Sequence, residues 1–221
     1  MIKKQFGTYH NAIEKAWEDL NQLDLESIKE RCLCTVNAEQ GEIHLKFINQ
    51  TYCISPAKLF AQSETGEEPP GPVLLLLLHY LISAKAVPLT GQLLPYRKLP
   101  AGDVFSKPFK VRSIEPLARV FANDEKLFIE AGKALGGKQV PYGDAAVELP
   151  VFPRTPITCV LWTQCEEFPA AANILFDETA TEHFHIEDLA VLGEITAGTL
   201  ILQSGASDPG IGVLYDRETS Q

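Results

Sequence analysis

The residues best suited to chemistry gather between positions 140 and 188. A carboxylate borders each of three expected strands: Asp144 precedes one, Glu167 follows the next, and Asp177 ends the third. Carboxylates held close together raise one another's pKa, which suits general acid–base catalysis, or they bind a divalent cation that relieves their repulsion. We therefore predict that these three side chains meet at one edge of a sheet.

Neighbouring side chains enlarge this candidate site. The ligand-binding set that we predict is Asp144, Trp162, Glu166, Glu167, Asp177 and Asp188. A divalent metal is the cofactor that such a set suits, and two imidazoles follow closely in the sequence. Nitrogen and oxygen ligands suit zinc, manganese or iron, so the expected metal ligands are Asp177, His183 and His185.

Structural roles are the alternative for the same residues. Asp177 and Asp188 are placed to accept hydrogen bonds from amides at the starts of helices. Thr179 and Glu182 have the spacing of a capping box. These alternatives stay open from the sequence.

The net charge of −10 arises from one stretch that lacks Lys and Arg. The chain has 29 acids and 19 bases, and ten of the acids lie between Arg154 and Arg217, namely Glu166, Glu167, Asp177, Glu178, Glu182, Glu187, Asp188, Glu194, Asp208 and Asp216. A field of one sign repels phosphate and attracts metal ions, amines or basic protein surfaces. We expect a small cationic ligand or a basic protein surface as partner, and neither nucleic acid nor a membrane.

The cysteines and the chain start favour a cytoplasmic protein. Five cysteines without a C-x-x-C pair indicate neither a disulfide framework nor a zinc ribbon, so we expect buried, reduced thiols. A soft-metal trio of Cys32, Cys34 and Cys53 across a hairpin is the alternative. Lys3 and Lys4 are followed by no apolar run, so no signal peptide is expected.

The elements that must position these residues follow from periodicity. Three- and four-residue spacing predicts helices at 8–22, 25–31, 114–121, 124–135 and 187–197, and a buried helix at 73–84, while the capping box at 179–182 opens a short helix. Alternation predicts strands at 34–37, 42–47, 51–55, 145–149, 157–162 and 173–176, with His44 on a solvated face. The proline-rich stretch 87–109 is expected to be ordered but irregular.

Strands and helices occur in separate blocks, which favours an α+β fold with largely antiparallel strands in two blocks, about 34–55 and 145–177. We expect a single domain with a possible N-terminal lobe at 1–62, a main body at 73–203 and a polar tail at 204–221.

Ordered short motifs over most of the chain resemble a known family. The first block is Leu74 to Leu81, Pro88-Leu89-Thr90-Gly91 and Tyr96-Arg97-Lys98-Leu99-Pro100. The second is Gly136-Gly137, Gly143-Asp144, Pro153-Arg154-Thr155-Pro156, Trp162, Glu166-Glu167-Phe168-Pro169, Leu175-Phe176-Asp177 and Glu187-Asp188-Leu189. The family is an uncharacterised domain of unknown function, family 3786, of anaerobic bacteria and archaea. The resemblance implies no activity, but it favours a cytoplasm of low redox potential.

Three hypotheses follow for a protein whose function the sequence leaves unknown. The leading one is an accessory or binding protein with an acidic site for a small cation, a metal or a basic partner. The second is a hydrolase or lyase with a carboxylate base and His183 or His185 as acid. The third is a structural interaction module with an exposed apolar patch at 87–109 or 211–215.

Overall fold

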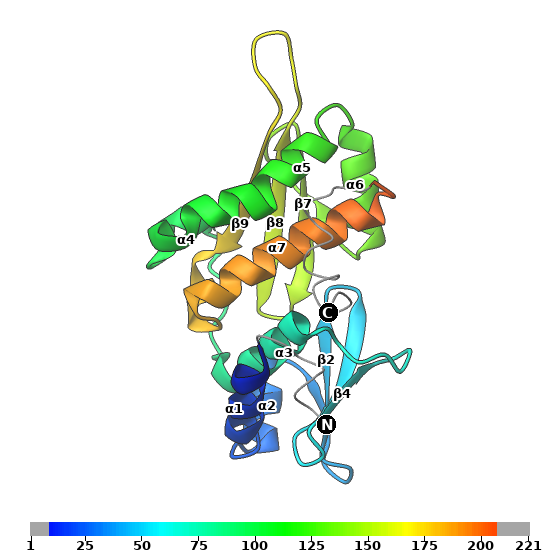
Figure 1. Cartoon of the computed structure of the whole chain (residues 1–221), viewed down its shortest axis with the longest axis vertical. Coiled ribbons are helices and arrows are strands. Elements are labelled where there is room, and N and C mark those ends of the chain that lie inside the picture. Colours follow the sequence, from blue (N-terminus) through cyan, green and yellow to red (C-terminus); the bar gives the residue numbers. More distant parts are fainter. Residues whose placement is uncertain (1–8, 207–221) are drawn as a thin grey trace.

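Two antiparallel sheets divide the chain between them (Figure 1). The structure is a computed structural model that describes residues 9–206. The first sheet has the strand order β1-β2-β3-β4, and the second has the order β5-β9-β8-β7-β6. Every strand pairs antiparallel to its neighbours, which confirms the predicted α+β class.

Three helices pack around the first sheet. Its strands are β1 (Thr35–Asn37), β2 (Glu42–Phe47), β3 (Gln50–Ser55) and β4 (Phe60–Ser63), and its helices are α1 (His10–Leu20), α2 (Leu25–Cys32) and α3 (Gly71–Ser83). Ile43, Leu45 and Phe47 alternate along β2 and are all buried. That period of two places one face of the sheet in the core and leaves the other polar.

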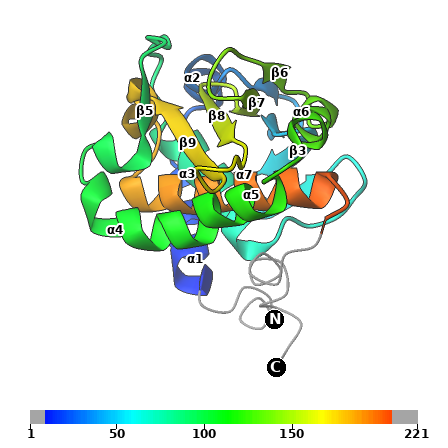
Figure 2. The same cartoon turned by 90° about the horizontal axis from the view of Figure 1, so that it is seen from above.

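The second sheet is covered on one face by helices, as Figures 1 and 2 show. Its strands are β5 (Leu93–Pro95), β6 (Lys138–Gln139), β7 (Ala145–Phe152), β8 (Thr155–Trp162) and β9 (Ala171–Asp177). The covering helices are α4 (Gly102–Phe109), α5 (Glu115–Val120) and α7 (Ile186–Gln203), while α6 (Glu125–Ala134) precedes β6. None of the helices within residues 9–206 has both the length and the apolar character required to cross a bilayer.

The stretch 87–109 is more regular than its prolines predicted. It contains β5, a 3-10 turn at Tyr96–Lys98 and all of α4. Pro108 lies inside α4, and a π-helical turn at Lys110–Ile114 follows it directly, where a wider turn accommodates the interrupted hydrogen bonding. Packing of Phe109 against Tyr96, with ring centroids 4.2 Å apart, holds this helix in place.

The two sheets share one hydrophobic core. The N–H of Ile48 donates to the carbonyl of Val151 at 2.9 Å, and the ring centroids of Phe47 and Phe152 are 4.9 Å apart. Tyr80 on α3 stacks on Phe152 at 4.5 Å. The division into a lobe at 1–62 and a body at 73–203 stays a prediction, and most of the predicted tail at 204–221 lies outside the described residues.

Candidate functional site

The three carboxylates expected at one sheet edge lie at opposite ends of the second sheet. Ala145 is paired with Leu161, and Phe176 is paired with Ile157. Asp144 therefore lies level with the end of β8, whereas Asp177 lies level with Pro156 near its start, about 20 Å away at 3.4 Å per residue. The predicted convergence is wrong because β7, β8 and β9 run alternately up and down. The hypothesis of a hydrolase or lyase with a carboxylate base depended on this convergence and therefore loses its support.

The residues at the Asp144 end engage local groups or face solvent. Asp144 accepts hydrogen bonds from the N–H and the hydroxyl of Thr163, at 2.8 and 3.1 Å. Trp162 is 42% exposed, and Glu166 and Glu167 are exposed in the loop between β8 and β9. This loop projects away from the body of the protein (Figure 1). These side chains are therefore exposed, and that of Asp144 is held by local hydrogen bonds.

Asp177 is buried and fixes the loop before β5. Its carboxylate accepts hydrogen bonds from the N–H and hydroxyl of Thr90, the N–H of Gly91, and the N–H and hydroxyl of Thr179. Burial alone would raise the pKa of Asp177, but the hydrogen bonds from Thr179, Gly91 and Thr90 outweigh it and hold the pKa below its usual range. Asp177 caps the following 3-10 helix at Glu178–Glu182, which is the structural role expected as the alternative, and the predicted capping position of Thr179 is wrong.

The predicted metal ligands are not assembled. Nδ1 of buried His183 accepts the N–H of Lys85 at 3.3 Å, and its Nε2 has no hydrogen-bond partner among residues 9–206. Burial, reinforced by the charge of Arg154, lowers the pKa of His183 to about 4, so its imidazole is neutral at pH 7. His185 is exposed as the N-cap residue of α7. In the part of the chain that the structure describes, Asp177 and these two histidines form no group within ligand distance.

Acids of the stretch that lacks Lys and Arg are paired with basic side chains from earlier in the chain. Glu182 pairs with Lys85 at 2.7 Å, and Asp188 pairs with His79 at 3.0 Å. Arg112 lies 4.0 Å from Glu194. The expected one-sign field is therefore partly neutralised by side chains from earlier in the chain. Asp208 and Asp216 lie outside the described residues.

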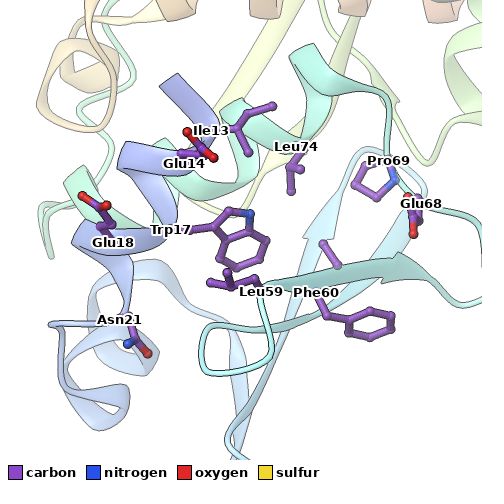
Figure 3. Close-up of a pocket in the computed structure, with 11 residues that line it drawn as sticks. Ile13, Glu14, Trp17, Glu18, Asn21, Leu59, Phe60, Glu68, Pro69 and Leu74 are labelled. Carbon is purple, nitrogen blue, oxygen red and sulfur yellow. The ribbon is translucent and has the colours of Figure 1, made fainter. Parts of the chain in front are cut away.

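A cavity of about 560 Å³ lies at the first sheet instead. Figure 3 shows its walls: α1, the turn into β4, and the segment that leads into α3. The lining residues are Ile13, Glu14, Trp17, Glu18, Asn21, Leu59, Phe60, Ala61, Glu68, Pro69 and Leu74. Trp17 is only 6% exposed and lies between Leu59 and Leu74, so the interior of the cavity is apolar and aromatic.

Carboxylates surround the apolar interior of this cavity. Glu14 and Glu18 lie one helical turn apart on α1, and Glu68 approaches from the opposite wall (Figure 3). No Lys or Arg is found among the described residues that line the cavity. The helical spacing of residues 14–18 is a signal that could have placed both acids beside Trp17, but the facing wall comes from residues 59–74, including the unpredicted strand β4. Sequence reasoning therefore missed this site.

Comparison with known proteins places the chain in a family. Residues 24–199 match the family described as Domain of unknown function (DUF3786). The chain belongs to this family. No curated protein and no solved structure matches it. The function of the protein is thus unknown, and the chemistry of its own side chains is the guide to it.

The family match covers only part of the cavity. The wall from Leu59 to Leu74 lies within the matched residues, whereas α1, with Glu14, Trp17 and Glu18, precedes them. The acidic and aromatic side of the cavity is therefore contributed by a segment outside the shared region.

Proposed function

We propose that this protein binds a small organic cation with an apolar body, such as an alkylamine or a diamine, in the cavity between α1 and β4. One observation carries this proposal. A cavity lined by buried Trp17 carries three carboxylates, those of Glu14, Glu18 and Glu68, on its walls.

The dimensions and the lining both suit such a ligand. Small-molecule sites span roughly 300–1,000 Å³ and combine an apolar lining with a few polar groups that orient the ligand. The methylene groups of an amine would pack on Leu59 and Leu74, and its charged head would lie near the carboxylates. A cation over the face of Trp17 would gain about 0.5–2 kcal/mol from the ring quadrupole.

The broader setting that we propose agrees with this role. We propose an accessory or binding protein in the cytoplasm, because all five cysteines carry free thiols. The net charge of −10 supports a cationic ligand and disfavours nucleic acid and anionic membranes as partners.

Fluorescence of Trp17 provides a direct test. The chain has two tryptophans, so Trp162→Phe leaves Trp17 as the single tryptophan reporter. This variant is titrated with butylamine, 1,4-diaminobutane, tetramethylammonium and, as the neutral match, 1-pentanol. We expect saturable changes in Trp17 emission with at least one cation and none with the alcohol.

Charge variants then locate the binding. Replacing both Glu14 and Glu18 by Gln should weaken binding about 3- to 30-fold, because each exposed ion pair contributes up to about 1 kcal/mol. Glu39→Gln, in an exposed turn, is the matched control and should leave affinity unchanged. The proposal fails if no cation gives saturable binding at millimolar concentration, if the alcohol binds equally well, or if the Gln variants bind as the parent does.

A further inference from the structure

Three side chains with metal-binding chemistry lie together on the first sheet. His44 on β2 is directly opposite Cys53 on β3. Glu42 precedes His44 by two residues, so it lies on the same face of the sheet. Each of the three side chains offers one ligand atom, and these atoms all lie within 4.8 Å of one another.

The face that carries them is the polar face of the sheet. Ile43, Leu45 and Ile54 alternate with these residues and are fully buried in the core. Glu42, His44 and Cys53 are half-buried, so an ion can reach them from solvent while part of their surroundings stays dry. Cys32 and Cys34 belong to the core, and the sulfur trio considered from the sequence is therefore not formed.

We propose that Glu42, His44 and Cys53 form a zinc site that leaves one coordination position open to water or a ligand. Zinc binds thiolate, imidazole and carboxylate at about 2.0–2.3 Å in tetrahedral geometry, and three protein ligands with an open fourth position are typical of its non-structural sites. A mixed sulfur, nitrogen and oxygen set disfavours magnesium and calcium, which take oxygen ligands. The site shares no residue with the proposed cation cavity.

Protons and a neighbouring cation compete with the metal at this site. A thiol binds zinc as the thiolate, so binding at Cys53 releases a proton and weakens as the pH falls. The ammonium of Lys58 lies 3.4 Å from Glu42 and competes with the metal for that carboxylate. Lys58→Gln should therefore tighten zinc binding severalfold.

Calorimetry and cobalt spectroscopy test the proposal on the full-length protein after chelator treatment. We expect one Zn²⁺ per chain with a Kd at or below about 1 µM, which corresponds to roughly −8 kcal/mol. Proton release should accompany binding, measured by titration in buffers of different ionisation enthalpy. Co²⁺ at the same site should give a near-ultraviolet thiolate-to-cobalt band.

Matched variants assign the ligands. Cys53→Ser and His44→Asn should each weaken Zn²⁺ binding by at least ~100-fold, because loss of a group that is only hydrogen-bonded to a metal ligand already costs 10- to 100-fold. Cys165→Ser, which removes an exposed thiol elsewhere, should bind zinc as the parent does. Binding that survives both ligand variants, a cobalt complex without the thiolate band, or no binding at 100 µM Zn²⁺ would overturn the proposal. Urea unfolding of each variant shows that it is folded, and either ligand variant is sufficient.

Discussion

The guanidinium of Arg154 donates a hydrogen bond to the backbone carbonyl of Arg31 and so ties the β7–β8 turn to the end of α2. The same guanidinium donates to the carbonyls of Glu30 and Val87, each at 3.1 Å. The backbone N–H of Arg154 donates to the hydroxyl of Tyr80 at 3.1 Å. One side chain, in the turn between β7 and β8, thus binds three carbonyls in two segments, the end of α2 and the loop at Val87.

Arg31 continues this network towards the first sheet's largest helix. Its guanidinium donates to the carbonyls of Leu81, Ile82 and Ala84, where α3 ends. The last carbonyls of a helix have no partner within it, and they carry partial negative charge, so a guanidinium suits both needs. Arg154 therefore joins the β7–β8 turn to α2, and Arg31 joins α2 to the end of α3, in both cases through backbone carbonyls.

Arg154→Lys should destabilise the protein by about 2–4 kcal/mol, because an ammonium on a flexible stem cannot reach three carbonyls in the fixed geometry of a guanidinium. The free energy of unfolding is measured in urea at pH 7. Arg97→Lys, on an exposed turn, is the control and should stay within about 0.5 kcal/mol of the parent. A similarly small effect at Arg154 would show that its hydrogen bonds to α2 and to Val87 contribute little to stability.

His183 should make stability depend on pH in the mildly acidic range. Its pKa is lowered from 6.5 to about 4 in the folded protein. Between these values the unfolded chain binds the proton more readily, so stability is full above pH 6.5 and declines towards pH 4. The loss amounts to at most about 3 kcal/mol, at 1.36 kcal/mol per unit.

The variant His183→Asn separates this contribution from that of the carboxylates, because the amide oxygen of Asn can still accept the N–H of Lys85. Urea unfolding is followed from pH 7.5 to pH 4.5 for the parent, this variant and His185→Asn, whose side chain is exposed. The decline of the unfolding free energy with falling pH should become shallower in the His183→Asn variant alone. Parallel slopes in all three proteins would contradict the lowered pKa.

Asp177→Asn should cost about 2–3 kcal/mol, because one carboxylate oxygen accepts the N–H of Gly91 at 2.7 Å while the other accepts from Thr90 and Thr179. An amide would direct an N–H group at one of these donors and leave it unsatisfied. Asp144→Asn is the matched comparison, since a single oxygen of Asp144 accepts both hydrogen bonds from Thr163 and Asn can supply that oxygen.

Thermal and urea unfolding at pH 7 should therefore show a larger loss of stability for Asp177→Asn than for Asp144→Asn. The stabilisation from Asp177 is present above pH 3.8 and is lost as the pH falls through the lower pKa of the folded state. Equal effects at both positions would show that the cluster of donors around Asp177 adds nothing to stability.

The sequence predicted the fold better than the site, for a physical reason. β2 alternates with a period of two and β8 is a mostly buried run of eight residues, whereas β4, β5 and β6 have only four, three and two residues and depend on pairing with a neighbour. Alternation also says which face a residue occupies but not which way its strand runs. The predicted meeting of Asp144 and Asp177 was wrong because it depended on strand direction, which alternation does not give.

Long-range contacts explain what else was missed. The pairing of Glu182 with Lys85 and of Asp188 with His79 joins segments about a hundred residues apart, so a tally of charge along the chain could not show it. Likewise, His44 was correctly predicted on the polar face, but its neighbour Cys53 depends on the exact register of β2 with β3.

Gly193→Ala should destabilise the protein although alanine is the better helix former by about 1 kcal/mol. Gly193 lies within α7, and a Cβ there would contact Cε2 of Phe109 and lie 2.8 Å from its Cζ. The Phe109 ring cannot easily yield, because it stacks on Tyr96 at 4.2 Å and lies against Phe176. Overpacking of this kind costs about 1–3 kcal/mol.

In a double-mutant cycle with Phe109→Leu, the smaller side chain should relieve the clash, so the two changes together should cost less than their sum. Additive effects in urea unfolding would show that α7 accommodates the methyl group by another route.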